Sequence, residues 1–201
     1  PRAALRQEES SITEDTVRHW FDANYDSLTK TEHAYLAKIQ RDAALRQVLH
    51  YVERQHGDWS AIQQAEVDVS LVKPEYIIDG KIDLIRGEGN TVEIVDFKAE
   101  RKPDMERDRE KMEQYRRQLH LYAYLVEANM GQKVSKMHLY YTGEENGVPT
   151  ITYPYTRTAV EGTVAAFDET VHKIMKKDFH SRTTDLKVCT ECDFRFYCKN
   201  K

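Results

Sequence analysis

The sequence has 201 residues, of which 40% are hydrophobic and 32% are charged, which is enough for one large domain with a buried core. No stretch approaches the ~18 apolar residues of a membrane span, and no charged-then-apolar signal segment opens the chain. We therefore expect a cytoplasmic protein without a membrane partner. The net charge of −4 does not by itself indicate a nucleic-acid ligand. Residues 171–201, however, carry 8 Lys/Arg against 4 Asp/Glu, so this end is the better suited to meet phosphate.

The predicted elements alternate between helical and strand periodicity along the chain. Apolar positions recur at helical spacing over residues 11–56, 106–128 and 159–177. Period-two alternation and short apolar runs predict five strands, at residues 66–71, 76–85, 91–97, 133–142 and 149–155. Gly87-Glu88-Gly89-Asn90 is a strong turn signal between the second and third strands. The order predicts an α/β fold with one central mixed sheet flanked by helices.

Two aspartates and a lysine occupy the second and third predicted strands. If the hairpin loop is residues 87–90, Asp83 faces Ile94, and Asp96 and Lys98 share the face of Asp83. Asp83 and Asp96 are then diagonal neighbours about 7 Å apart at the backbone, which lets both carboxylates reach one Mg²⁺. A surface hairpin with a ladder of ion pairs is the competing interpretation. The hydrophobic flanks of Asp96 make the two interpretations about equally strong, because that strand looks at least half buried.

Three motifs occur in a fixed order along this region. They are Gly80-x-x-Asp83, then Asp96-x-Lys98, then Gln118-x-x-x-Tyr122 on the following helix. Together they resemble the RecB-type branch of the PD-(D/E)xK nuclease superfamily, over roughly residues 66–201. The resemblance implies a restriction-endonuclease-like core with a Cys-bearing C-terminal tail. It also implies one domain over residues 1–201, with an N-terminal helical part (1–60), a nuclease core (66–180) and a Cys-rich tail (181–201).

The resemblance also implies roles for individual residues. Asp83, Asp96 and the backbone carbonyl of Phe97 would ligate Mg²⁺ or Mn²⁺, and Lys98 would orient the attacking water and stabilise charge on the phosphate. Gln118 and Tyr122 share a helix face and would line the DNA path, although core packing is an equally good interpretation of Tyr122. Glu66 is a secondary acidic candidate, since a solvated strand glutamate is as plausible. Neither His19 nor His33 matches the family's active-site histidine well.

All three cysteines lie within the last thirteen residues, as Cys189-x-x-Cys192 followed by Cys198. This clustering favours a metal or cluster site over disulfides. The spacing resembles the C-terminal iron–sulfur site of AddB-type nucleases, which implies a [4Fe–4S] cluster; zinc is the alternative. Both need a fourth ligand. The sequence has no upstream cysteine, so we expect that ligand to lie outside this chain, with His172 and His180 as weak substitutes for a zinc ion.

From these features we expect a Mg²⁺-dependent deoxyribonuclease that acts with a helicase in DNA repair or recombination. No Walker A motif is present, so the motor would belong to another part of a longer helicase–nuclease polypeptide or to a partner chain. The chain begins at Pro1, which suggests a fragment of such a polypeptide. Two alternatives remain open. One is a catalytically silent nuclease-like DNA-binding module, and the other is a zinc-stapled interaction domain with incidental acids.

Overall fold

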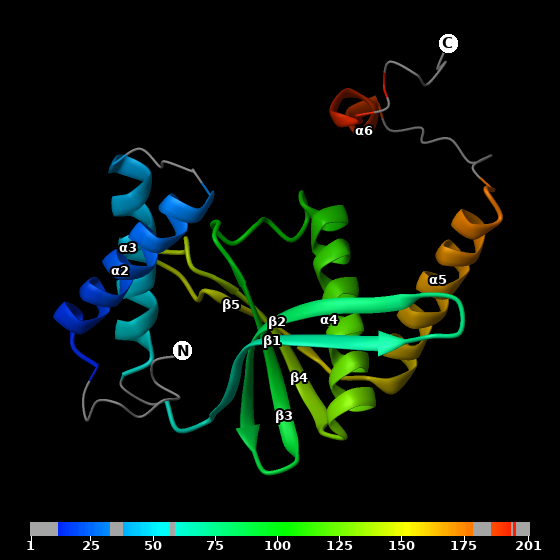
Figure 1. Cartoon of the computed structure of the whole chain (residues 1–201), viewed down its shortest axis with the longest axis horizontal. Coiled ribbons are helices and arrows are strands. Elements are labelled where there is room, and N and C mark those ends of the chain that lie inside the picture. The colour runs from blue at the N-terminus through cyan, green and yellow to red at the C-terminus, as the bar shows by residue number, and fades with distance from the viewer. Residues whose placement is uncertain (1–11, 33–37, 57–58, 179–185, 194, 196–201) are drawn as a thin grey trace. The chain divides into compact units, whose positions relative to one another are not determined.

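The computed structural model describes residues 12–32, 38–56, 59–178, 186–193 and 195 (Figure 1). The chain divides into two compact units, Pro1–Thr163 and Val164–Lys201. The first unit contains the sheet and the helices against it. No described helix is both long and apolar enough to cross a membrane.

A five-stranded sheet forms the centre of the first unit (Figure 1). Its strands are β1 (Ile62–Val72), β2 (Ile77–Glu88), β3 (Thr91–Lys98), β4 (Lys133–Tyr141) and β5 (Thr150–Pro154). They lie in the order β1-β2-β3-β4-β5, and every pair is antiparallel except β3 and β4, which are parallel. A parallel pair needs a crossover, and α4 (Arg109–Met130) supplies it. The predicted α/β plan of a mixed sheet flanked by helices is confirmed.

Helix α4 covers one face of the sheet. Its apolar residues recur at helical spacing, and Met112, Leu119, Ala123 and Val126 are all buried. The helix ends at Gly131, whose φ of 64° is the left-handed conformation common after a helix C-terminus. Residues 94, 96 and 98 of β3 alternate onto the face that α4 covers, so this helix sets the surroundings of Asp96 and Lys98.

The opposite face of the sheet packs against α3 (Lys38–Arg54). Tyr51 of α3 is buried with Leu84, Val95 and Tyr140. Its ring meets the ring of Phe97 edge to face at 5.0 Å between centroids, and that of Tyr140 at 5.1 Å. The predicted helical stretch 11–56 thus contains two helices, α2 (Glu14–Glu32) and α3. The hydroxyl of Thr13 caps α2 by accepting the Thr16 N–H at 3.2 Å.

The β2–β3 hairpin differs from the predicted one. The structure pairs Arg86 with Glu93 and Glu88 with Thr91, so the turn has two residues, Gly89 and Asn90, and the predicted loop over residues 87–90 is wrong. The reason is that Gly87 belongs to the strand, with a φ of 142°. Gly89, with a φ of 56°, takes the first turn position, where two-residue hairpins of type II′ favour glycine.

Strand β2 changes sidedness along its length. Leu84 packs against Tyr51 of α3, whereas a Cβ on Gly80 would lie 3.0 Å from the ring of Tyr122 in α4. Strict alternation would place the side chains of residues 80 and 84 on one face of the sheet. The strand therefore departs from strict alternation between these two residues. At this level of the sheet, Glu66 of β1 has a φ of 53°, which is unusual for a residue with a side chain.

The second unit contains the C-terminal part of α5 (Arg157–Met175) and the short helix α6 (Leu186–Glu191). Helix α5 begins in the first unit and matches the predicted helix at residues 159–177 within two residues at each end. Of the three cysteines, Cys189 and Cys192 are described, and Cys198 lies outside the described residues.

Candidate active site

Three carboxylates lie in one row across neighbouring strands. Backbone pairing between β2 and β3 reaches Leu84 and Val95, and the next position in this register sets Asp83 opposite Asp96. On the other side, Glu66 lies between the paired positions Ala65 and Val67, which sets it opposite Asp83. The predicted diagonal placement of Asp83 and Asp96 is therefore replaced by a direct one, because the hairpin turn is two residues shorter than expected.

Asp83 lies where the backbone pairing of β2 and β3 ends. Its carboxylate oxygen Oδ2 accepts the Phe97 N–H at 2.7 Å, in the place of a main-chain carbonyl. Burial raises the pKa of Asp83, and the charges of Asp96 and Glu66 raise it further, against the Phe97 hydrogen bond and the charge of Lys98, which lower it. Burial therefore disfavours the charged form of Asp83 more than its hydrogen bond and Lys98 favour it.

The Lys98 ammonium lies in a pocket of three contacts. Its Nζ is 2.7 Å from Oδ2 of Asp96, donates to Oε1 of Gln118 at 3.0 Å, and lies 4.0 Å from the ring centroid of Tyr115. The side chains of Lys98 and Asp96 are only 14% and 6% exposed, so solvent screens this pair little. Strand β3 and helix α4 thus fix the ammonium beside the acids.

Gln118 links Lys98 to Tyr122. Its amide Nε2 donates to the Tyr122 hydroxyl at 2.9 Å while its Oε1 receives the lysine. Burial raises the pKa of Tyr122, with Asp96 and Asp83 adding to the effect, so the hydroxyl lies near both acids. The structure brings residues of the three sequence motifs together in one group of neighbouring side chains. The roles of these residues stay predictions.

Glu66 approaches this group from β1. Its charge is among the influences that raise the pKa of Asp83, and its carboxylate lies 3.8 Å from the Lys81 ammonium. The side chain is half exposed. A left-handed backbone at a glutamate costs on the order of 1–3 kcal/mol and is commonly retained at functional sites. This backbone favours a site role for Glu66 over an incidental surface position.

Sequence reasoning missed three residues around Lys98. The Tyr115 ring lies against its ammonium, the Tyr115 hydroxyl donates to Glu100 at 3.0 Å, and Lys111 contacts the same carboxylate at 2.5 Å. Spacing signals could have found two of them. Glu100 is two residues beyond Lys98, on the same side of an extended chain, and Tyr115 is one helical turn before Gln118.

The chemistry of the acidic row suits a hard divalent cation. Oδ2 of Asp96 is buried and, despite its close approach to Lys98, has no hydrogen-bond partner of acceptable geometry among the described residues. Asp83 stands opposite, with a pKa raised chiefly by burial. Within the described part of the chain, no three His, Cys, Asp or Glu residues are grouped to hold a metal ion. Two carboxylates nevertheless suffice for Mg²⁺, which keeps several waters and binds substrate phosphates.

The remaining candidates lie elsewhere. Cys189 and Cys192 both belong to the second unit and are of intermediate exposure. His19 is exposed on α2, His172 lies on α5, and both His33 and His180 lie outside the described residues. The structure therefore assembles the β2, β3 and α4 residues and leaves the cysteine ligand set untested.

Comparisons with known proteins agree with this geometry. Residues 3–199 match the family model of the PD-(D/E)XK nuclease superfamily. The fold is similar to the crystal structure of a "Putative exonuclease" from Eubacterium rectale, with a TM-score of 0.55 and 15% identity, over 100% of this chain and 79% of that one. A weaker similarity to SSO0001, with a TM-score of 0.43 and 17% identity, covers 96% and 87% of the two chains. No curated protein matches significantly. Because the family match spans nearly the whole sequence, the chain belongs to the PD-(D/E)XK nuclease superfamily.

Proposed function

We propose that this chain is a Mg²⁺- or Mn²⁺-dependent deoxyribonuclease that hydrolyses phosphodiester bonds. The observation that carries the proposal is the contact chain from Asp96 through Lys98 and Gln118 to Tyr122, with Asp83 opposite Asp96. Membership of a nuclease superfamily supports it, as does the fold shared with a protein whose description names an exonuclease.

Asp83 and Asp96 would hold the cation, with the carbonyl of Phe97 as a further ligand and Glu66 as a secondary acidic neighbour. When bound, such an ion lowers the pKa of its water and offsets charge on the phosphate. The residues themselves are suited to this occupancy. Oδ2 of Asp96 is buried without a hydrogen bond of acceptable geometry among the described residues, and burial raises the pKa of Asp83, so a bound cation would stabilise both carboxylates.

Lys98 would orient the attacking water and stabilise negative charge as it develops on the phosphate. Its ammonium is held by Asp96 and Gln118 before any substrate arrives, so little reorganisation is needed at the moment of reaction. Gln118 and Tyr122 extend the polar surface along α4, where a DNA strand would pass. Among the residues that the structure describes, Lys98 supplies the positive charge directly beside Asp96.

The test is Lys98→Ala in a DNA cleavage assay with Mg²⁺. We expect the substitution to reduce the cleavage rate at least about a hundredfold, as the loss of one preorganised charge donor does elsewhere. Lys38→Ala, which removes an exposed lysine at the start of α3, is the matched control and should cut normally. Equal cutting by wild type and Lys98→Ala would show that the catalytic assignment is wrong. A wild type that binds DNA without cutting it would favour a silent binding module.

We further propose, from the motif resemblance, that the chain is a RecB/AddB-like module that works with a helicase in DNA repair or recombination. The cysteines would then hold a [4Fe–4S] cluster, with Cys189, Cys192 and Cys198 as ligands and a fourth ligand from outside this set. The full-length polypeptide, purified without oxygen, should contain iron and sulfide in near-equal amounts. Zinc alone would overturn the cluster and favour a zinc-stapled tail.

A further inference from the structure

A cavity lies on the opposite face of the sheet from Asp83 and Asp96. It has a volume of about 480 Å³, within the ~300–1,000 Å³ range of small-ligand pockets. Tyr51 and Arg54 of α3, Arg86 of β2 and the segment after Gly147 contribute to its walls. None of the proposed catalytic residues lines this cavity, so the nuclease proposal leaves it without a role.

The lining of the cavity is cationic in an acidic protein. It includes two arginines and no aspartate or glutamate. His138 also lines the cavity, but burial lowers the pKa of its imidazole, so the positive charge comes from the two arginines. Arg54 donates to the carbonyl oxygens of residues 144 and 145 at 2.7 and 2.9 Å, which fixes its guanidinium without neutralising it. Because the whole chain carries a net charge of −4, this local positive charge favours an anionic ligand.

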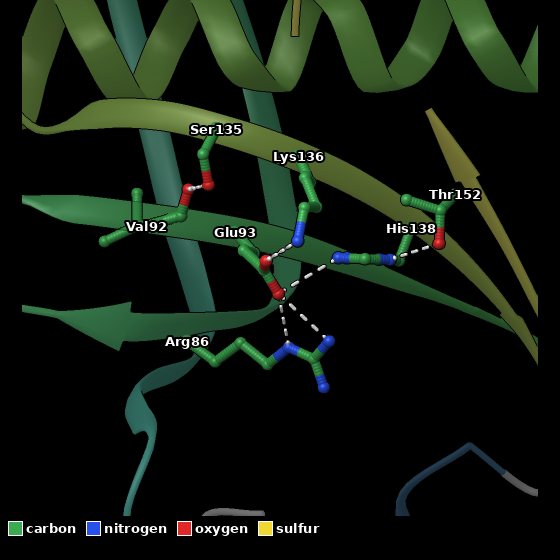
Figure 2. A network of polar contacts seen from close by, with 7 residues as sticks. All are labelled: Arg86, Val92, Glu93, Ser135, Lys136, His138 and Thr152. Carbon is green, nitrogen blue, oxygen red and sulfur yellow. Dashed lines mark hydrogen bonds and ion pairs between the residues drawn. The ribbon is translucent and has the colours of Figure 1, made fainter. Parts of the chain in front are cut away.

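A polar network behind the cavity holds Arg86 in place. Its Nε and Nη2 contact the Glu93 carboxylate at 3.1 and 3.0 Å. Lys136 and His138 reach the same carboxylate at 3.2 and 3.1 Å, so one acid serves three basic side chains. Figure 2 shows this network beneath the sheet, away from the α4 helix, with the third guanidinium nitrogen of Arg86 turned away from Glu93. The network therefore presents a preorganised donor.

The second observation is an unpartnered hydroxyl in the cavity wall. Tyr140 is 8% exposed and lines the cavity, yet its buried hydroxyl has no hydrogen-bond partner among the described residues. A buried hydroxyl without a partner costs free energy, so its retention points to a group that binds it. The Leu84 and Val95 side chains complete an apolar floor beside these donors. Two guanidiniums, a phenol and an apolar floor suit a phosphate attached to a flat organic body.

We propose that this cavity binds a nucleoside monophosphate, with the phosphate at Arg54, Arg86 and the Tyr140 hydroxyl and the base over Leu84 and Val95. The choice of nucleotide rests on the proposed nuclease function, since hydrolysis of terminal phosphodiesters releases such products. The ligand chemistry itself rests on the cavity alone. Binding is measured without a divalent cation, so failure of cleavage and failure of this site are separate results.

The experiment is isothermal titration of the full chain in EDTA with deoxyadenosine monophosphate. Tyr140→Phe removes only the unpartnered hydroxyl, so it should keep or raise the temperature of thermal unfolding and weaken binding about tenfold or more. Arg54→Gln should weaken binding at least as much and serves as a second variant. Asp96→Asn is the matched control on the other face and should bind like wild type.

Four outcomes of these titrations would overturn the proposal, and a fifth comes from comparison with a strand end. The four are no binding by wild type, unchanged binding by both Tyr140→Phe and Arg54→Gln, loss of binding in Asp96→Asn, and inorganic phosphate binding as tightly as the nucleotide. A 5′-phosphorylated oligonucleotide is titrated in parallel to distinguish a strand end from a free nucleotide. Binding of the oligonucleotide alone would likewise overturn the assignment to a mononucleotide.

Discussion

At the scale of single residues, the position of Lys98 depends on more than its acidic neighbour. Asp96 supplies the opposite charge, Gln118 an acceptor and Tyr115 an aromatic face. Glu100 in turn orients Tyr115 through its hydroxyl. An ammonium on a four-carbon stem is flexible, so these contacts determine whether it stays beside the phosphate.

Tyr115→Leu removes the ring beneath the Lys98 ammonium. We expect kcat for DNA cleavage to fall roughly two- to thirtyfold, the range that a cation–π contact supports, while KM stays close to the wild-type value. Steady-state kinetics with Mg²⁺ measure both constants. The positioning role predicts that Tyr115→Phe, which keeps the ring, recovers most of the activity.

Tyr124→Leu is the matched control for this substitution. Tyr124 lies on the same helix beneath a different lysine, with Lys73 at 5.3 Å from its ring centroid, outside the candidate site. An equal loss of kcat in Tyr124→Leu would mean that any tyrosine removed from α4 disturbs the fold, and the assignment of Tyr115 to Lys98 would be wrong.

At the scale of elements, periodicity predicted every strand and the helix between β3 and β4. The predicted strand at residues 133–142 differs from the observed β4 by only one residue. The agreement is close because the apolar run of this strand has clear boundaries in the sequence at both ends. The turn between β2 and β3 was the exception. Glycine at residue 87 suggested a loop, and only the chain's conformation shows that this glycine continues the strand.

The same limit applies to the site. The shared face of Asp83, Asp96 and Lys98 could be predicted from alternation, which is a local property of strands. Their contact with Gln118 required a resemblance to known nucleases. Spacing places Glu100 near Lys98 and Tyr115 near Gln118. Their contacts with each other and with the Lys98 ammonium join different elements, and no spacing rule within one element reports such contacts.

The β2–β3 hairpin depends on Gly87 more than on Gly89. A Cβ at residue 87 would lie 2.4 Å from the carbonyl oxygen of Thr91, in a backbone conformation that side chains rarely adopt. We expect Gly87→Ala to lower the free energy of unfolding by about 3 kcal/mol or more, from a steric clash added to backbone strain. Urea denaturation followed by circular dichroism measures the loss.

Gly89→Ala is the control within the same turn. Its φ of 56° is also left-handed, but a Cβ there would meet nothing within 4 Å. The expected cost is therefore only about 1–2 kcal/mol. Equal losses for the two variants would show that backbone conformation alone, without the contact to Thr91, limits the hairpin.

At the scale of the whole molecule, the candidate catalytic residues all belong to the unit Pro1–Thr163, and the cysteines belong to Val164–Lys201. Asp83 and Asp96 lie on central strands, and Lys98 is held by the helix that connects β3 to β4. Since these elements come together only in the folded state, a cation bound by the acids stabilises the fold as a whole.

Asp83→Asn should reverse its effect on stability when a metal is added. The folded-state pKa of Asp83 is raised, chiefly by burial, so its protonated form favours folding and this contribution is lost as pH rises through that pKa. In EDTA at neutral pH we therefore expect Asp83→Asn to unfold at a higher temperature than wild type. The amide oxygen can still accept the Phe97 N–H.

Adding Mg²⁺ should then favour the wild type. Saturation to a hundred times Kd stabilises a protein by about 2.7 kcal/mol, which raises its melting temperature, whereas Asp83→Asn has lost a ligand and should respond weakly. Calorimetry measures the melting temperatures in EDTA and in Mg²⁺. The control is Asp79→Asn, at an exposed position of the same strand, which should behave as wild type in both conditions. Lower stability of Asp83→Asn in EDTA would contradict the raised pKa of Asp83. Equal shifts of the melting temperature with Mg²⁺ in wild type and Asp83→Asn would place the cation elsewhere, because the two proteins differ in the Asp83 side chain alone.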